Sequence, residues 1–339
     1  MERYVIALDA MGGDHAPDAT VGGAVQALRR FEDISMILTG PKDRIEALLA
    51  GADDVRRRIE IVDCDEVITM DEHPMMAVRK KVNSSMVQAM LAVREKRADA
   101  AVSAGSTGAL LACGMLRVGR IPGIERPALA PVLPGANGPF LLIDSGANVD
   151  CQPKYLTQFG LMGSVYMSAV MGVKEPKVGL VNIGTETEKG NKLTKETFQM
   201  MSAQTGYRFA GNCEAREVPT GDFDVVVADG FDGNIILKYT EGIVSVLFGM
   251  IKKNLKLSFR TKIGAFLCKP GFRKLKKSMD YNAYGGAPLL GVEGAIVKAH
   301  GSSGDEAIAN AIRQAREMLA GEVVEKIRSG LGNLSEQAE

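Results

Sequence analysis

The chain has 339 residues, of which 46% are hydrophobic and 24% charged, and its formal net charge is zero. This is ordinary globular composition, and the length allows two lobes with a core each. The balanced charge excludes any chain-wide signal for nucleic-acid binding, so we expect no nucleic-acid partner.

Cysteine usage and apolar runs narrow the class of protein further. Five cysteines are scattered, no C-x-x-C motif occurs, and only three histidines are present, so we expect neither a zinc site nor disulfides. The N-terminal stretch MERYVIALDAMGGD carries an acid at its second position and enters a strand pattern directly, which predicts no signal peptide. No apolar run reaches about 18 residues, so we expect no membrane-spanning segment and a cytoplasmic location.

Short apolar runs alternate with segments of helical periodicity along most of the chain. The expected strands span residues 4–9, 35–40, 59–64, 99–105, 139–146, 177–184, 207–212 and 223–230. Helical stretches lie between most of them, at 18–31, 84–97, 106–118 and 155–172. This alternation predicts an α/β fold of three layers, αβα, in which helices cover both faces of a largely parallel sheet.

Five of the expected strands end in loops that combine glycine with Asp, Asn, Ser or Thr. These ends read LD-AMGGD, SAGSTGA, IDSGAN, NIGTETEKGN and ADGFDGN. Open α/β sheets bind ligands beyond the carboxyl ends of their strands, where glycine admits a ligand and N–H groups attract anions. Each loop alone fits an ordinary tight turn equally well, but five of one kind at one expected edge favour a binding site.

Motifs for common nucleotide and hydrolase sites are missing. No G-x-G-x-x-G follows the first strand, and no P-loop or G-x-S-x-G elbow with a triad occurs. The stretch SAGSTGALL (103–111) is the best small-anion candidate, because its glycines and hydroxyls lie where a strand becomes a helix. The stretch AHGSSGDEA (299–307) follows the strand AIVKAH in the same form, and its serines fit helix capping better than ligand contact.

Several acidic side chains also lie at the strand ends. They are Asp9, Asp14, Asp144, Asp229 and Asp232. Carboxylates at such positions can gather a magnesium ion, but they fit helix capping and loop anchoring better. We therefore expect no metal site.

Residues 242–280 form a strongly basic segment, called the basic arm below. Between Gly242 and Met279 there are ten Lys or Arg residues and no Asp or Glu, while the rest of the chain carries an acidic excess. Apolar residues recur at helical spacing, and Pro270-Gly271 is expected to break the helix. These features predict a helical hairpin. The apolar series is Leu247, Ile251, Leu255, Phe259, Ile263 and Phe266.

Two interpretations of the basic arm stay open. It packs on the body with a solvated basic face, or it protrudes and its tip lies on an anionic membrane surface. In the second case its cations bind lipid headgroups and its apolar side chains insert. RNA binding is less favoured, since no aromatic stacking platform accompanies the charge. The side chains expected to contact the membrane are Phe259, Ile263, Phe266, Leu267 and Phe272.

Six motifs in order resemble those of the bacterial phosphate acyltransferases of phospholipid synthesis, the PlsX family. They are IALDAMGGDHAP (6–17), SAGSTGALL (103–111), LIDSGAN (142–148), NIGTETEKGN (182–191), ADGFDGN (228–234) and YGGAPLLG (284–291). The resemblance runs over essentially the whole chain without an interrupted motif. It implies transfer of a long fatty acyl group from acyl carrier protein to inorganic phosphate, with no cofactor. The acyl phosphate product would feed glycerol-3-phosphate acylation at the membrane.

The resemblance also implies a fold and an assembly. The fold is similar to phosphotransacetylases and to the isopropylmalate dehydrogenase class, with two α/β lobes around a cleft, and the assembly is a homodimer. We expect residues 1–125 and 285–330 to form the first lobe and residues 126–284 the second, which includes the arm at 242–280. Residues 331–339 are expected to be a tail.

Roles within the expected site follow as hypotheses. Phosphate is already a nucleophile and a thioester is already activated, so positioning and oxyanion stabilisation suffice without a covalent intermediate. Lys189 offsets charge on phosphate or on the departing thiolate, Asn234 donates to the carbonyl oxygen, and Asp229 orients either of them. The expected phosphate- and substrate-binding residues are Gly105, Ser106, Thr107, Gly108, Asp9, Gly12, Gly13, Asp144, Asn148, Gly184, Glu186, Gly233 and His300.

Two other functions remain open. The expected docking surface for a carrier protein follows from the distribution of basic residues. The alternatives are a short-chain phosphotransacetylase-like enzyme using coenzyme A, and a non-catalytic membrane lipid-binding scaffold. Acyl carrier proteins are acidic, so docking needs a basic patch, which the arm or the Arg79-Lys80-Lys81 cluster can provide. We expect peripheral association with the inner face of the cell membrane, where a membrane glycerol-3-phosphate acyltransferase is a candidate partner.

Overall fold

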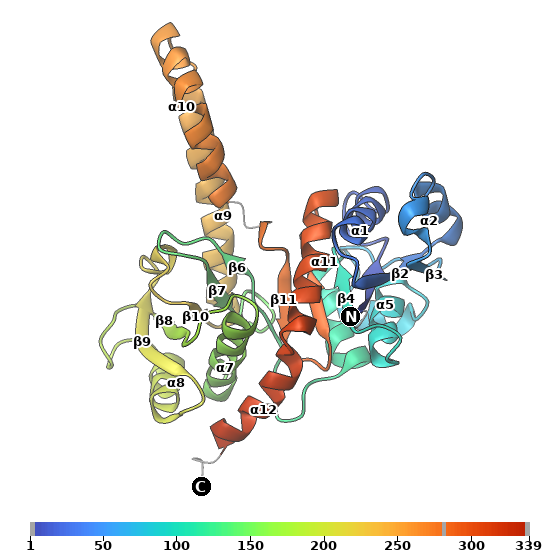
Figure 1. The fold of residues 1–339 in the computed structure, drawn as a ribbon. Coiled ribbons are helices and arrows are strands. Elements are labelled where there is room, and N and C mark those ends of the chain that lie inside the picture. Colours follow the sequence, from blue (N-terminus) through green and yellow to red (C-terminus); the bar gives the residue numbers. More distant parts are fainter. Residues whose placement is uncertain (1–3, 280–282, 336–339) are drawn as a thin grey trace.

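The computed structural model describes residues 4–279 and 283–335, and Figure 1 shows two sheet-containing lobes with one long projection. The first sheet has seven strands. Their spatial order is β3 (Ile59–Asp63), β2 (Ile34–Gly40), β1 (Tyr4–Asp9), β4 (Ala100–Ser103), β12 (Ala295–Lys298), β11 (Ala287–Leu290) and β5 (Ala128–Leu129). The strands from β3 to β12 run parallel, while β11 pairs antiparallel with both of its neighbours.

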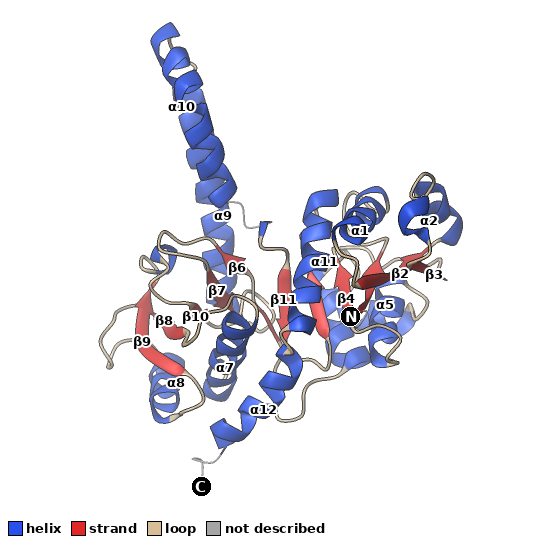
Figure 2. Cartoon of the chain, in the orientation of Figure 1, coloured by secondary structure: helices blue, strands red, loops and turns tan. Residues whose placement is uncertain are grey.

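Helices cover both faces of this first sheet (Figure 2). Side chains alternate along β1, so Ile6 and Leu8 enter the main core while Ala7 enters a second core on the opposite face. The main core also receives α1 (Asp18–Arg30) and α11 (Asp305–Ala320), and the second receives α5 (Ser85–Arg94). The predicted αβα layering is therefore correct here. The shorter helices of this lobe are α2 (Lys42–Leu48), α3 (Asp53–Arg56), α4 (Pro74–Lys80), α6 (Thr107–Cys113) and the π-helical turn Gly114–Val118.

The second sheet has five strands. Their order is β6 (Val132–Leu133), β7 (Phe140–Ile143), β10 (Val225–Val227), β8 (Lys177–Asn182) and β9 (Arg208–Glu214), and β6–β7 is the antiparallel pair. The helices α7 (Pro153–Ala169) and α8 (Lys192–Ala203) cover one face and continue the main core of the first lobe. The other face is covered more thinly, by a small cluster that includes Ile236 and Leu237 of α9 (Gly230–Asn254) and lies near the 3-10 turn Val218–Thr220.

Two elements lie at the expected lobe boundaries. The strand β5 pairs with β11 in the first sheet, a few residues beyond the boundary expected after residue 125. The helix α12 (Val323–Ser335) includes half of the expected tail, and Leu331 and Leu334 contact the main core. Helical periodicity of apolar residues explains why this segment is a helix, since its apolar face packs near α7.

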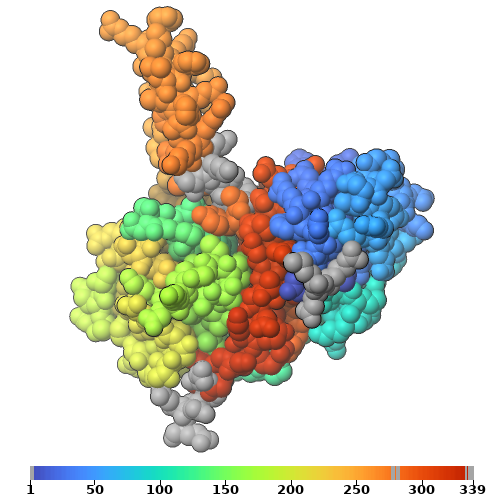
Figure 3. Space-filling model, viewed as in Figure 1, coloured from blue at the N-terminus to red at the C-terminus, as the bar shows by residue number. Residues whose placement is uncertain are grey.

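The basic arm is a pair of long helices that projects from the body (Figures 1 and 3). The chain rises along α9 and returns along α10 (Phe259–Ser278). The turn falls before Phe259 because Ser258 and Thr261 cap the new helix: each side-chain oxygen accepts a hydrogen bond from the other residue's N–H, at 3.0 and 3.2 Å. The expected break at Pro270-Gly271 is wrong, since Pro270 lies inside α10. An exposed helix tolerates the lost hydrogen bond because water reaches the freed carbonyl.

Apolar side chains remain exposed along the whole arm. Phe259 is 78% exposed and Phe266 74%. Further exposed apolar residues are Ile243, Val246, Leu247, Met250, Leu257, Ile263, Leu267 and Leu275. The interpretation in which the arm packs on the body is therefore wrong. An uncovered apolar surface of this extent indicates a contact with a partner outside the single chain.

One helix of the described chain has the length and composition to cross a membrane. It is α9, whose most apolar window has a mean hydropathy of 1.3 and is not buried at all. The criterion of an uninterrupted apolar run does not detect this helix, because Lys238 and Glu241 interrupt its apolar residues. Length and composition alone are weak evidence for a span, and the base of α9 is built into the second lobe.

Candidate functional site

Three strand ends of the first lobe converge at one edge of the sheet. The strands β1, β4 and β12 are neighbours and parallel, so their carboxyl ends lie side by side. The Asp14 amide donates to the Gly301 carbonyl at 2.8 Å. A side chain at Gly12 would lie 2.7 Å from the Gly105 nitrogen, and one at Gly13 would lie 2.9 Å from the Gly301 oxygen. Glycine is required at both positions because the three backbones touch there.

A buried carboxylate holds these loops together. Asp9 is 1% exposed, and it accepts a hydrogen bond from the Ser103 hydroxyl at 2.7 Å and another from the Met11 amide at 3.2 Å. The Ser103 hydroxyl in turn accepts the Gly105 N–H at 3.0 Å. Burial raises the pKa of Asp9, while hydrogen bonds from Ser85 and Ser103 and the charge of Lys298 oppose the shift. The Gly105 N–H is thus occupied inside the loop, and its role in binding phosphate stays a prediction.

Lys298 is a candidate residue that the sequence analysis missed. It ends β12 and its ammonium donates to the carbonyl of Ala104 at 3.5 Å and to the carbonyl of Ala299. Burial lowers its pKa to about 8, although Asp9 and Asp14 act in the opposite direction. A lysine inside the otherwise apolar strand AIVKAH was the available signal, because lysine is rarely placed in a buried strand without a function.

The other residues expected in the first lobe lie around this centre. Ser106 caps α6, its hydroxyl accepting the Ala109 N–H at 3.4 Å, so its side chain has the ordinary capping role. Thr107 is exposed in the first turn, and a side chain at Gly108 would lie 2.7 Å from Pro74. His300 is exposed and its Nδ1 lies 2.9 Å from the Ser302 hydroxyl.

Asp144 is the corresponding buried carboxylate of the second lobe. It follows β7, is fully buried, and accepts four hydrogen bonds. The donors are the amides of Leu129 at 3.0 Å, Ala147 at 3.1 Å and Asn148 at 2.6 Å, and the Asn148 side chain at 3.0 Å. Burial raises the pKa of Asp144 and these bonds lower it. Because Leu129 belongs to the first sheet, this carboxylate fixes the β7 loop against the other lobe.

The first turn of α9 is packed directly on the Asp144 loop. The Gly230 amide donates to the Asn148 carbonyl at 2.7 Å. A Cβ atom added at Gly233 would lie 1.9 Å from the backbone carbonyl oxygen of Asp144. Asn234 faces Gly146, where an added Cβ would lie 3.4 Å from its side-chain oxygen. The structure therefore brings together the expected Asp144, Asn148, Gly233 and Asn234.

Asp229 is a helix cap, the role that the sequence analysis favoured for the strand-end carboxylates over a metal site. Its carboxylate caps α9 by accepting the Asp232 N–H at 2.8 Å. Among the described residues, no hydrogen bond or ion pair joins it to Lys189 or Asn234. The D-x-x-D spacing before a long helix is the local capping signal behind this role.

The loop after β8 carries Lys189 to the surface. Its backbone is held by the Asn182 side chain, which donates to the Lys189 carbonyl at 3.1 Å, and by Asn212, which donates to the Glu186 carbonyl at 2.9 Å. A side chain at Gly184 would lie 2.7 Å from the Glu186 carboxylate. Lys189 and Glu186 are exposed, and within residues 4–279 and 283–335 no partner engages the Lys189 ammonium. This charge is therefore available to a ligand.

The structure thus holds three clusters rather than one closed site. The first lobe groups Asp9, Gly12, Gly13, Gly105 and Lys298; the β7–α9 cluster groups Asp144 with Asn234; the third holds Lys189. Within the described chain no hydrogen bond or ion pair links them, and no three His, Cys, Asp or Glu side chains gather in a way that could hold a metal ion. A cleft between the lobes remains a prediction.

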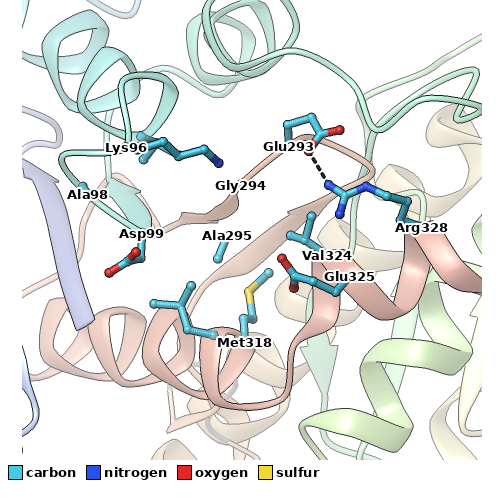
Figure 4. A pocket seen from close by; sticks show the side chains of 12 residues that line it. Lys96, Ala98, Asp99, Glu293, Gly294, Ala295, Met318, Val324, Glu325 and Arg328 are labelled. Carbon is cyan, nitrogen blue, oxygen red and sulfur yellow. Dashed lines mark hydrogen bonds and ion pairs between the residues drawn. The ribbon is translucent and has the colours of Figure 1, made fainter. Parts of the chain in front are cut away.

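Two cavities lie elsewhere in the molecule. One of about 150 Å³ lies at the opposite edge of the first sheet, where β4 and β12 begin, beside the ion pair of Glu293 and Arg328 at 2.5 Å (Figure 4). The other, of about 780 Å³, lies where β8 and β9 begin, and Pro176 and Arg208 line it. Neither contains a strand-end residue of the candidate site, so neither is its substrate pocket.

Comparisons with known proteins agree on one family. The model of the family described as "Fatty acid synthesis protein" matches residues 4–326. The chain is 53% identical over 322 residues to the phosphate acyltransferase of Clostridium perfringens, covering 95% of each chain. It is 49% identical to the phosphate acyltransferase of Clostridium acetobutylicum, covering 98% of this chain and 100% of that one.

Solved structures show the same architecture at low identity. A phosphotransacetylase from Streptococcus pyogenes is similar with a TM-score of 0.62 at 16% identity, covering 95% of this chain and 94% of that one. A branched-chain phosphotransacylase from Enterococcus faecalis is similar with a TM-score of 0.59 at 15% identity, covering 93% and 99%. These likenesses confirm the predicted fold class.

Proposed function

The chain belongs to the fatty acid synthesis protein family, and from this premise we propose that it transfers a long-chain fatty acyl group from acyl carrier protein to inorganic phosphate. Membership makes it an enzyme, an acyltransferase, which removes the alternative of a non-catalytic scaffold. The observation that carries the proposal is the match of 53% identity over 95% of both chains to a phosphate acyltransferase. The product, acyl phosphate, would serve glycerophospholipid synthesis.

Direct attack by phosphate fits the thiols of the chain. Burial raises the pKa of four cysteine thiols to about 12, so these remain protonated at neutral pH. They are Cys64, Cys113, Cys151 and Cys213. Cys268 is exposed on the arm, far along the chain from the strand ends. A phosphate oxygen attacks the thioester carbonyl, the tetrahedral oxyanion collapses, and the carrier thiolate leaves with the bonding electron pair.

Three groups of the site have roles in this reaction. The first-lobe loops hold phosphate, Asn234 donates its side-chain N–H to the developing oxyanion, and Lys189 offsets the charge that the reaction moves. Positioning the two reactants supplies about 7–11 kcal/mol of the barrier reduction. One well-placed oxyanion donor adds roughly 3–4 kcal/mol.

The carrier and the membrane use the basic surfaces. Arg79 and Lys80 are exposed on α4, whose first residue Pro74 contacts Gly108 of the candidate phosphate loop. An acidic carrier docked there delivers its thioester beside that loop. Lys81 of the same cluster is already paired with Glu72 at 2.7 Å and contributes less.

We propose two contacts for the exposed apolar surface of the arm, one near its turn and one nearer the body. Near the turn, Leu257 and Phe259 are accompanied by Lys256 and Arg260, the pattern of a segment that binds an anionic lipid surface. Further down, the apolar residues between Ile243 and Met250 fit the arm of a second copy in a homodimer. We place the enzyme at the inner face of the cell membrane, next to a membrane glycerol-3-phosphate acyltransferase that consumes the product.

Incubation with palmitoyl-carrier protein and labelled phosphate tests the proposal. We expect labelled acyl phosphate whose formation requires phosphate and the carrier-bound donor. The fold likeness to phosphotransacetylases favours one alternative, a short-chain enzyme that uses coenzyme A. A parallel reaction with acetyl-coenzyme A distinguishes the two, and faster turnover of that donor would replace the proposal with the alternative.

A further inference from the structure

We propose that Lys298 is the cation that binds the phosphate acceptor, and that Lys189 serves the departing thiolate. The inference deepens the proposed function and rests on it. It is carried by the position of the Lys298 ammonium among the three converging strand ends of the first lobe.

Among residues 4–279 and 283–335, the hydrogen bonds of Lys298 leave its charge without a counter-ion in contact. An ammonium has three N–H donors, and the two bonds observed go to the neutral carbonyls of Ala104 and Ala299. Asp9 acts on Lys298 only through space, since within the described chain its carboxylate accepts hydrogen bonds from Ser85, Ser103 and Met11 and forms no ion pair. Burying an ammonium without a counter-ion costs free energy, and a bound anion offsets that cost.

Lys298 is also reachable from the expected phosphate loop. Ala104, whose carbonyl it contacts, directly precedes Gly105, and the side chain is only partly covered. Asp9 is buried, while Asp14 on the β1 loop is exposed, and both charges act on Lys298. The region around Lys298 is therefore open to a small anion on the side of the β1 loop.

The charges of this region need such a cation. Asp9 and Asp14 would repel a phosphate dianion, and Lys298 is the cation on which both act. Lys189 lies in the other lobe, at the end of β8, and contacts none of these groups within the described chain. Two cations on two lobes suit a reaction with an anionic nucleophile and an anionic leaving group.

A pH dependence follows from the position of Lys298. Burial lowers its pKa to about 8, against the opposing charges of Asp9 and Asp14. A bound dianion favours the ammonium and raises that pKa again. Phosphate affinity should therefore fall as pH rises through about 8, where phosphate is already a dianion, and binding there should take up a proton. His300, two residues away, is exposed, and its Nδ1 lies 2.9 Å from the Ser302 hydroxyl.

Calorimetric titration of the purified full-length protein with inorganic phosphate, without an acyl donor, tests the inference. We expect Lys298→Met to weaken phosphate binding roughly 10- to 100-fold, as loss of a charge-assisted hydrogen bond does. Its KM for phosphate should rise by the same factor, with the KM for the acyl donor unchanged. The matched control is Lys177→Met, a lysine at the opposite end of a parallel strand, which should bind phosphate as the wild type does.

Two further measurements separate binding from a structural role. In Lys298→Arg the guanidinium stays charged, so the decline of affinity above pH 8 should disappear. If the variants fail to fold, wild-type titrations in two buffers of different ionisation enthalpy at about pH 9 should show uptake of most of one proton per phosphate. Absence of uptake would overturn the inference.

The outcomes also separate this inference from the proposed function. Acyl phosphate formation with an unchanged phosphate KM in Lys298→Met would overturn the role of Lys298 and leave the proposed function standing. If phosphate binds through Lys298 but the wild type forms no acyl phosphate, the proposed function is overturned and the anion site at Lys298 stands.

Discussion

The strand ends of the two lobes use the same residue types and differ in what they leave available. In each lobe a buried aspartate, Asp9 or Asp144, accepts hydrogen bonds from neighbouring loops. In the first lobe the associated cation, Lys298, is half-buried among three strand ends. In the second, Lys189 is exposed on a loop that polar side chains hold at its backbone.

This difference matches two kinds of reactant. A small anion is bound best by a preorganised and partly desolvated charge, because little has to move when it enters. A thioester on a carrier protein is large, so the group that meets it has to be reachable from outside. In the proposed reaction the buried aspartates serve as anchors, and the two lysines are the groups that contact the reactants.

The largest expected effect is on stability, at the anchor of the second lobe. Replacing Asp144 by Ala removes the acceptor of four buried or partly buried hydrogen bonds, and we expect the free energy of unfolding to fall by about 3–5 kcal/mol. Urea unfolding measures this. Asp229→Ala, which removes an accessible helix cap, is the control and should cost about 1 kcal/mol. Equal losses in the two variants would contradict the anchor role.

The next effect is on turnover, at the exposed cation. Lys189→Ala should lower kcat by about 10²–10³-fold, while the urea midpoint and the phosphate KM stay unchanged. Stability is unaffected because no partner in the described chain engages the ammonium. Lys192→Ala, an exposed lysine at the start of α8, is the matched control. A near wild-type rate would remove Lys189 from the site, and a raised phosphate KM would move it to the acceptor side.

Asn234 should show a smaller effect on the same quantity. Its side chain faces Gly146 at the base of α9, and as one neutral donor to the oxyanion it should lower kcat about 10–100-fold on replacement by Ala. The KM values should change less than kcat, since the bond strengthens in the transition state. Asn254→Ala, at the other end of the same helix, provides the comparison. If KM rises while kcat holds, Asn234 binds the ground state instead.

Substitutions in the arm should have the smallest effect on turnover and a large effect on membrane binding. Changing Phe259, Phe266 and Phe272 to Glu should abolish flotation with anionic vesicles, while turnover of a soluble donor stays at the wild-type level. Met200→Glu, at an exposed apolar position of the body, controls for added charge. Vesicle binding that survives the triple change would remove the membrane role from these side chains.

Local patterns in the sequence determined much of this molecule. Alternation of apolar runs with helical periodicity was sufficient for the α/β class, because side-chain period follows directly from backbone geometry. Glycine-rich strand ends located the candidate site, since parallel strands place their carboxyl ends at one edge. The six ordered motifs indicated the family, which the comparisons then confirmed.

Tertiary structure alone decided which charges are anchors and which are available. Lys298 and Asp9 are separated by most of the chain, and strand order, which no local pattern encodes, places β12 two strands from β1. The same contacts showed that Asp144 reaches the edge strand of the other lobe. The hydrogen bonds also identify Asp229 as the cap of α9 and locate the turn of the arm at Ser258. Burial and pairing depend on residues distant in sequence, so they emerge only when the two sheets are assembled.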